Sequence, residues 1–184
     1  MTRVSMTRRL GSTGPTVFPL ALGCMGMSGV YGNSEDDEGI ATIHAALELG
    51  IGATAYGVLS RGLLSGSAPS GSGDFRSSLP RFRGENLARN QRLVDQLRKI
   101  ASEKRMTPSQ LAIAWVLAKG SSIVPVIGAR KRTQLTEAFG ALQFELSEDD
   151  IARLEEAIPS AAVGGTRYDE HQMKMLDSER GKGS

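Results

Sequence analysis

The sequence predicts an α/β protein in which short apolar strands are each followed by a loop and a helix. Three segments have this strand-like character, near residues 19–23, 51–56 and 122–127. The second runs into a loop rich in Gly and Ser, and the third ends just before a helix with several cations in its first turn. Strands that alternate with helical patterns are typical of a parallel sheet.

Composition excludes several classes of function. The chain has 184 residues, of which 40% are apolar and 23% charged, which suits one globular domain with a sizeable core. Its net charge of +2 is too small to predict binding to nucleic acid or to an anionic membrane. Neither a signal peptide nor a membrane-spanning run is visible, so we expect a cytoplasmic protein. The single cysteine, Cys24, rules out an intrachain disulfide and a cysteine zinc cluster, and we expect it to be a buried thiol without a metal.

The first 50 residues predict a hairpin, a strand and a helix. Residues 7–20 contain two short strands around a Gly-Ser-Thr-Gly-Pro turn, and residues 19–23 form a strand that opens into a Gly-rich loop. Ser34 is the expected N-cap of the helix, and Gly50 ends it. We predict that its buried face consists of Ile40, Ile43 and Leu47.

The second half of the chain predicts mainly helices. Residues 65–83 are rich in Gly, Ser and Pro and are expected to form a mobile loop. Helices are predicted from about 85 to 104, from a capping box at Thr107, over 133–139, and from the N-cap Ser147 to about 158. The helix after Thr107 is apolar nearly all round and is therefore expected to be buried, with Trp115 in the core.

Two strand ends carry the chemistry of a phosphate site. Residues 54–66 place Arg61 at the centre of a Gly- and Ser-rich loop, where backbone N–H groups and a guanidinium can meet an anion. Tyr56, at the mouth of this loop, offers a flat ring for stacking. Residues 123–138 place Arg130 at the start of a helix. Gly-rich turns and surface cations occur in many proteins without binding a ligand, so these residues alone leave both readings open.

Together the two stretches resemble the seventh and eighth strand–loop–helix units of the aldo-keto reductase family. The resemblance runs from Arg8 to the C-terminus, and it implies a partial (β/α) barrel of the TIM type with about three parallel strands and an N-terminal hairpin. It also implies one truncated domain over residues 1–184. This domain would consist of a hairpin, first strand and helix over residues 7–51, the last two βα units over 52–158, and a C-terminal tail over 159–184. Tyr168, His171 and Met173 in this tail resemble the family's C-terminal loop near the substrate.

The resemblance implies that these two stretches hold NADP(H). Tyr56 would stack on the nicotinamide, Ser60 and Arg61 would meet the pyrophosphate, and Arg130 would meet the 2′-phosphate. The cofactor-binding residues that it implies are Tyr56, Gly57, Val58, Leu59, Ser60, Arg61, Gly62, Leu64, Gly128, Ala129, Arg130, Gln134, Glu137 and Ala138.

The family's catalytic aspartate, tyrosine, lysine and histidine have no counterpart here. Thr54–Gly57 mimics the family's second strand, but Ala53 stands where the aspartate is needed. Everything downstream matches the seventh strand, so strands two to six are expected to be missing and no catalytic residue is assigned. Recombination between Glu-Leu-Gly-Ile repeats before strands two and seven is one hypothesis for this junction.

Three readings therefore remain from the sequence. The chain is an NADP(H)-dependent carbonyl oxidoreductase by descent, and it would act on a carbonyl substrate only if it is still active. Alternatively it is a catalytically dead cofactor-binding or interaction module, or a remnant without function. Exposed sheet edges in a three-strand barrel also suggest a homo-oligomer in which two copies cover each other's edges.

Overall fold

The computed structural model describes residues 8–9, 12–17, 36–67, 69–71 and 73–174. The chain divides into two compact units. One comprises Met1–Ala53 with Met175–Ser184, and the other comprises Thr54–Lys174. All of the predicted cofactor residues belong to the second unit.

The first unit contains a hairpin. Strand β1 (Arg8–Arg9) pairs antiparallel with β2 (Thr16–Val17), with Arg8 opposite Val17 and Arg9 opposite Thr16. The predicted hairpin is therefore confirmed over these residues. The strand expected at 19–23, its Gly-rich loop, Cys24 and the N-cap Ser34 all lie outside the described residues.

Helix α1 (Asp36–Glu48) also belongs to the first unit. Gly50 ends it as predicted, with φ +75° and a hydrogen bond from the Ile51 N–H to the Ala46 carbonyl at 2.9 Å. The predicted buried face is wrong for Ile40 and Ile43, which are 52% and 38% exposed. An apolar stripe is buried only where another element covers it, and no described residue of this unit belongs to the buried core. The side chain of Leu47 lies outside the description.

Two helices of the second unit, which start after Thr107 and Ser147, begin at the predicted caps. Helix α2 spans Gly84–Glu103, α3 spans Pro108–Ala118 and α5 spans Glu148–Ala157. Thr107 forms the expected capping box, because its Oγ1 accepts from the Gln110 N–H at 3.2 Å while Gln110 Oε1 accepts from the Thr107 N–H at 2.9 Å. Ser147 caps α5 in the same reciprocal way with Asp150.

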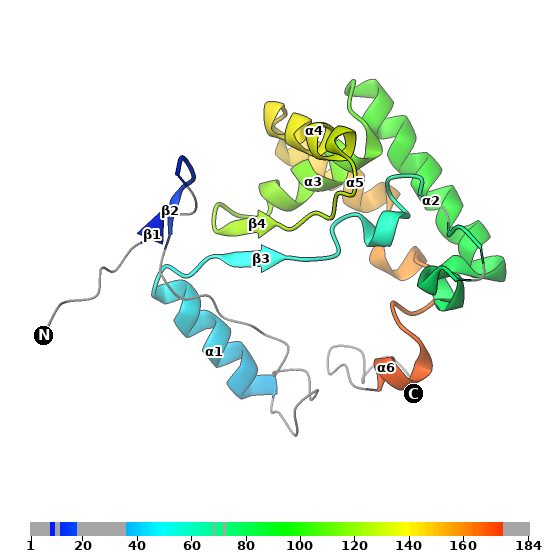
Figure 1. Ribbon diagram of the computed structural model, residues 1–184, viewed down its shortest axis with the longest axis horizontal. Coiled ribbons are helices and arrows are strands. Elements are labelled where there is room, and N and C mark those ends of the chain that lie inside the picture. Colours follow the sequence, from blue (N-terminus) through cyan, green and yellow to red (C-terminus); the bar gives the residue numbers. More distant parts are fainter. Residues whose placement is uncertain (1–7, 10–11, 18–35, 68, 72, 175–184) are drawn as a thin grey trace, which may run out of the picture. The chain divides into compact units, whose positions relative to one another are not determined.

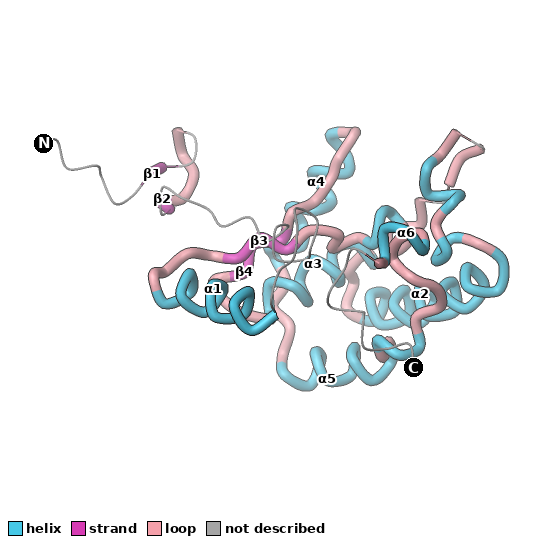
Figure 2. The backbone as a smooth tube through the Cα atoms, turned by 90° about the horizontal axis from the view of Figure 1, so that it is seen from below, coloured by secondary structure: helices cyan, strands magenta, loops and turns pink. Residues whose placement is uncertain are grey.

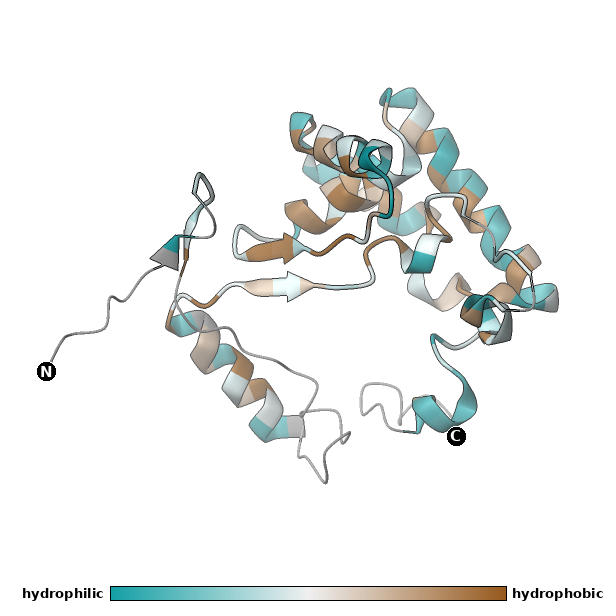
Figure 3. Ribbon diagram, viewed as in Figure 1, coloured by the Kyte–Doolittle hydropathy of each residue, from teal (hydrophilic) through white to brown (hydrophobic). Residues whose placement is uncertain are grey.

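Helix α3 is the centre of the core. It packs on α2, on strand β4 (Ile123–Pro125), on α4 (Arg132–Gly140) and on the 3₁₀ turn η5 (Ala141–Gln143). Figure 3 shows it as a strongly hydrophobic segment, as its sequence predicts. Trp115 is partly buried against this core, and its indole N–H donates to Glu155. The main cluster comprises Leu97, Ile100, Ala101, Met106, Leu111, Ala114, Leu146 and Leu154.

Two of the three expected strands lie within the described residues. Strand β3 (Ala53–Ala55) and β4 form one two-stranded sheet, and Figures 1 and 2 show them side by side. Their arrows run in the same direction in Figure 1, and the Val126 N–H donates to the Ala55 carbonyl at 2.8 Å. Both strand ends therefore lead into the same edge of the sheet, which is where the two predicted halves of the site begin.

The segment expected to be a mobile loop contains two 3₁₀ turns. After η2 (Ser60–Gly62), the chain forms η3 (Phe75–Ser78) and η4 (Pro80–Phe82). Leu79, between η3 and η4, is only 1% exposed. Phe82, in η4, is 6% exposed, so the segment buries two large apolar side chains that its Gly- and Ser-rich composition does not suggest. The chain ends its described part with η6 (Ser160–Ala162) and α6 (Glu170–Met173).

Among the described residues, no helix combines the length and the apolar character that crossing a bilayer requires.

We predict that Leu111→Ala destabilises the second unit by about 2–5 kcal/mol, because Leu111 is 0% exposed and its truncation leaves a cavity in the core. Chemical denaturation followed by circular dichroism measures the change. Leu142→Ala is the matched control, because Leu142 is 65% exposed and its truncation is expected to change stability by less than about 0.5 kcal/mol. Equal effects of the two variants would contradict the placement of α3 in the core.

Candidate functional site

An open cleft of about 1230 Å³ lies at the ends of strands β3 and β4. The loop after β3, the loop between β4 and α4, and the first turns of α4 line it. All of the residues predicted to bind the cofactor line this cleft except Leu64, which packs against the hydrophobic core. The structure thus brings together two stretches that are about seventy residues apart in the sequence. The side chain of Leu64 does not line the cleft and anchors the loop on the hydrophobic core.

The loop after β3 is a tight turn with four residues in the left-handed region. Gly57 and Gly62 have φ +74° and +93°, and the non-glycine residues Ser60 and Arg61 have φ +47° and +55°. Such a conformation costs a non-glycine residue on the order of 1–3 kcal/mol. Hydrogen bonds inside the turn hold it, including Ser60 N–H to the Gly57 carbonyl at 2.8 Å. These bonds occupy several backbone N–H groups of the turn, so its remaining capacity for an anion lies largely in the Ser60 and Arg61 side chains.

Arg76 holds this turn from the neighbouring segment. Its Nη1 donates to the carbonyl oxygens of Arg61 and Ser67 at 3.0 and 2.9 Å. Its Nε and Nη2 donate to the two carboxylate oxygens of Asp74 at 3.0 and 2.7 Å, a bidentate ion pair. A Cβ added at Gly62 would lie 2.9 Å from Arg76 Nη1, so glycine is needed for this close approach. Arg76 thereby links η3 to the turn that follows β3.

The carboxylate of Asp74 is strongly stabilised in its ionised form. It accepts hydrogen bonds from the Arg76 side chain and from the backbone N–H groups of Ser70 and Arg76. The guanidinium of Arg76, followed by the Ser70 N–H, holds the pKa of Asp74 well below its usual range. The ion pair between Asp74 and Arg76 therefore stays charged and intact at neutral pH.

The side chain of Arg61 reaches the C-terminal part of the second unit. Its Nη1 donates to the Arg167 carbonyl at 2.6 Å, and its guanidinium lies 4.5 Å from the centroid of the Tyr168 ring. The ring of Phe75 lies on the same guanidinium at 6.0 Å. Arg61 is thus held over the cleft by a segment more than a hundred residues away in the sequence.

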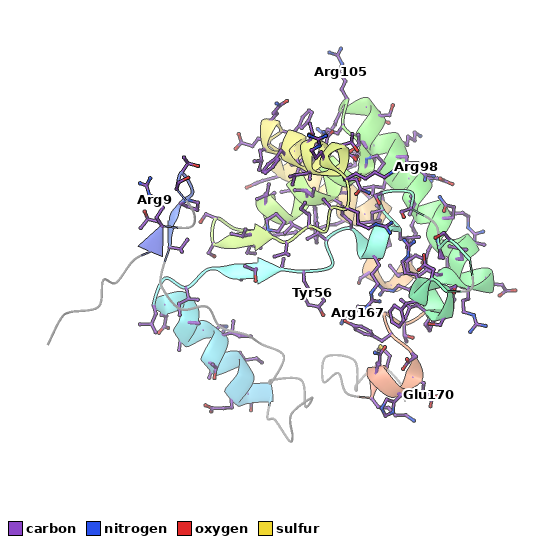
Figure 4. All side chains as sticks on the ribbon, viewed as in Figure 1. Arg9, Tyr56, Arg98, Arg105, Arg167 and Glu170 are labelled. Carbon is purple, nitrogen blue, oxygen red and sulfur yellow. The ribbon has the colours of Figure 1, made fainter. Side chains whose placement is uncertain are left out.

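Tyr56 lies at the mouth of the cleft with 71% of its surface exposed. Its hydroxyl oxygen is 3.5 Å from that of Tyr168, and this hydrogen bond, followed by partial burial, raises the pKa of Tyr56. Figure 4 shows Tyr56 pointing from the end of β3 toward the segment of Arg167, with Arg105 far from the cleft. The exposed ring is available for stacking, as the sequence predicts for this position.

The second half of the cleft is the N-terminus of α4. Gln134 Oε1 accepts from the backbone N–H groups of Arg130 and Lys131 at 2.8 and 3.0 Å. Gln134 therefore satisfies two of the orphan donors with which a helix start would otherwise bind an anion. The side chains of Arg130, Lys131 and Arg132 are exposed and supply the positive charge at this end.

Sequence reasoning missed part of the cleft lining. Five arginines and two carboxylates line the cleft: Arg61, Arg76, Arg81, Arg130, Arg167, Asp74 and Glu137. The excess of positive charge suits an anionic ligand. The Asp-Phe-Arg stretch at 74–76 could have suggested a local ion pair, but no pattern in the sequence links Arg167 or Arg81 to the loop after β3. Among the described residues, no cluster of His, Cys, Asp and Glu could hold a metal ion.

These features define a class of protein before any comparison. Two neighbouring strands that end at one edge of a sheet, with helices packed beside them, are the arrangement of part of an α/β barrel. The described part of the chain contains few of the strands that such a barrel has, so it is a partial α/β barrel.

Comparisons with known proteins identify the family. The chain belongs to the Aldo/keto reductase family, whose sequence pattern matches residues 26–159. This confirms the resemblance found in the two loop stretches.

The chain is similar to three curated relatives. It is 39% identical over 133 residues to the aldo-keto reductase yakc of Schizosaccharomyces pombe, whose name specifies NADP(+), covering 70% of this chain and 39% of that protein. It is 40% identical over 124 residues to probable aldo-keto reductase 1 of Glycine max, covering 66% and 36%. It is 33% identical over 147 residues to aldo-keto reductase str7 of Strobilurus tenacellus, covering 78% and 44%. The match thus spans less than half the length of each relative.

A solved structure supports the fold. The glycerol dehydrogenase of Gluconobacter oxydans superposes with a TM-score of 0.56 at 25% identity, covering 62% of this chain and 36% of that one.

We predict that Asp74→Asn lowers the melting temperature at pH 7, because it removes the ionised partner of Arg76. A carboxyl whose folded pKa is depressed stabilises the fold above its unfolded pKa, about 3.9, and loses this effect as the pH falls through the folded value. The difference between wild type and Asp74→Asn should therefore be full at pH 7 and shrink below about pH 4.

Thermal melts between pH 7 and pH 2 test this. The control Glu156→Gln, an exposed position on α5, should show little difference from wild type at any pH. A wild-type-minus-Asp74→Asn difference that does not change with pH would contradict the assigned role of the carboxylate.

Proposed function

We propose that this chain is a binding module for NADP(H) that retains the cofactor half of an aldo-keto reductase. The observation that carries the proposal is the cleft at the ends of β3 and β4, where all the expected cofactor residues but Leu64 converge. Membership of the family and the NADP(+) named for the S. pombe relative support the choice of ligand.

The chemistry of the cleft fits the parts of this cofactor. The exposed ring of Tyr56 would stack on the nicotinamide, and Arg61 and Ser60 would meet the pyrophosphate. Arg130, next to the N-terminus of α4, would meet the 2′-phosphate, which makes NADP the expected cofactor rather than NAD. When bound, the cofactor would supply a hydride donor or acceptor.

The proposal covers binding and does not extend to turnover. Reduction of a carbonyl in this family needs a proton donor beside the nicotinamide, and general acid catalysis contributes roughly 10²–10⁴-fold to the rate. The family's tetrad motifs find no match in this chain, and Ala53 stands where the aspartate is expected. Tyr56 does not replace the donor in this proposal, because a raised pKa makes its hydroxyl a weaker acid.

A second candidate function is association with another copy of the chain. Several large apolar side chains of β4, α4 and η5 are exposed in the second unit, with exposed fractions of 42–65%. They are Val124, Leu135, Phe139 and Leu142. Exposed apolar surface beside a strand edge favours association.

We predict that the purified chain binds NADP⁺ and that Arg130→Ala weakens this binding about tenfold, because a charge-assisted hydrogen bond contributes about 1.5–3 kcal/mol. Binding of NAD⁺, which lacks the 2′-phosphate, should change less than twofold. Isothermal titration calorimetry measures both affinities. Arg92→Ala, at an exposed position of α2 outside the cleft, is the matched control. No heat from a folded sample of wild type would refute the proposed function.

We also predict that the chain forms a dimer or larger oligomer in solution at micromolar concentration, because association covers apolar area that the isolated chain leaves in water. Sedimentation velocity measures this, and Phe139→Lys, at a residue 60% exposed, should shift the distribution toward monomer. A monodisperse monomer with a cooperative melt would argue against this second function.

A further inference from the structure

Asn90 joins two segments that are far apart in the sequence. It lies on α2, is only 2% exposed, and bonds to Gly164 in both directions. Its Nδ2 donates to the Gly164 carbonyl at 2.8 Å and to the Arg81 carbonyl at 3.0 Å, while its Oδ1 accepts from the Gly164 N–H at 2.8 Å. Both amide hydrogens and the amide oxygen are thus used, which only Asn or a closely similar group can do at this depth.

The segment around Gly164 has no room to move closer to α2, because its backbone already lies against η4 and α2. A Cβ added at Gly165 would lie 2.9 Å from the carbonyl carbon and oxygen of Pro80, and Gly165 has φ +77°. A Cβ at Gly164 would lie 3.1 Å from the Cα of Asn86. The segment around Gly164 is therefore pressed backbone to backbone against η4 and the first turns of α2, and the Asn90 amide sets its position.

This segment carries the groups that hold Arg61 over the cleft. Three residues beyond Gly164, the Arg167 carbonyl accepts from Arg61 Nη1 at 2.6 Å, and the next residue places its ring 4.5 Å from the Arg61 guanidinium. Arg61 and both of these residues line the cleft. Asn90, which does not line the cleft, thus determines where a cation of the cleft lies.

We propose that Asn90 is a positioning residue for the cleft: by fixing residues 164–168, it holds the Arg61 guanidinium where the pyrophosphate of the cofactor binds. This inference rests on the proposed function. It assigns to a buried amide on α2 a role at the end of the ligand where Arg61 lies; at the α4 end, Gln134 Oε1 accepts from the backbone N–H groups of Arg130 and Lys131.

The difference between the two ends makes a direct test possible. Asn90→Leu keeps the approximate size of the side chain and removes all three hydrogen bonds. Its affinity for NADP⁺ should fall at least tenfold, whereas its affinity for 2′-AMP, which carries the 2′-phosphate but neither phosphate of the pyrophosphate nor the nicotinamide, should change less than twofold. Calorimetry with wild type and variant measures both.

A second variant reaches the same segment without touching Asn90. Gly165→Ala should displace residues 164–168 through its clash with Pro80 and should show the same split between NADP⁺ and 2′-AMP. Ile100→Val, in the core and outside the cleft, is the control for general loosening and should leave both affinities within twofold of wild type. Limited trypsin digestion read by mass spectrometry should show faster cleavage after Arg167 in both segment variants than in the control.

The outcomes distinguish a failure of the proposed function from a failure of the positioning role of Asn90. Wild type that binds neither ligand refutes the proposed function, and with it the role of Asn90 in cofactor binding. Wild type that binds NADP⁺ while Asn90→Leu and Gly165→Ala bind it equally well overturns the positioning role alone. Equal weakening toward NADP⁺ and 2′-AMP also overturns it, because general unfolding moves both affinities together.

Discussion

Burial of helix α3 is the constraint on which the rest of the described structure depends. A helix that is apolar nearly all round must be covered on every side, and α2, α4, η5 and β4 do this. The same packing holds β4 beside β3 and directs both strand ends toward one edge. The cleft therefore exists because an apolar helix has to be enclosed, and its position follows from where the enclosing strands end.

Positive charge is concentrated where this packing opens to solvent. Two arginines of the cleft are oriented by different interactions: Arg76 by the Asp74 carboxylate, and Arg61 by the Arg167 carbonyl and the Tyr168 ring. An arginine held in this way loses less rotamer freedom when it binds a phosphate, so the loss of side-chain conformational entropy on binding is smaller. Asn90 lies outside the cleft and acts in the same way, because it restricts the motion of residues 164–168 and thereby of the Arg61 side chain.

Much of the second unit could be predicted from local patterns. The capping boxes at Thr107 and Ser147 and the apolar run after Pro108 act within a few residues of each other, so the helix positions followed directly. The failures were non-local. Ile40 and Ile43 have helical spacing but no described cover, and the Gly- and Ser-rich segment before α2 buries two apolar side chains, Leu79 and Phe82. Spacing indicates which face is apolar and says nothing of whether a partner covers it.

The sequence by itself indicated the family, most helices of the second unit and the two loop stretches that form part of the cleft, because strand ends, caps and Gly-rich turns are encoded by neighbouring residues. Only the tertiary structure decided how the cleft is held. The pairing of Asn90 with Gly164 and of Arg61 with Arg167 joins residues more than seventy positions apart, and the capping of α4 by Gln134 depends on a side-chain conformation. Contacts of this kind arise from packing, which brings distant segments into reach in ways that local pattern does not record.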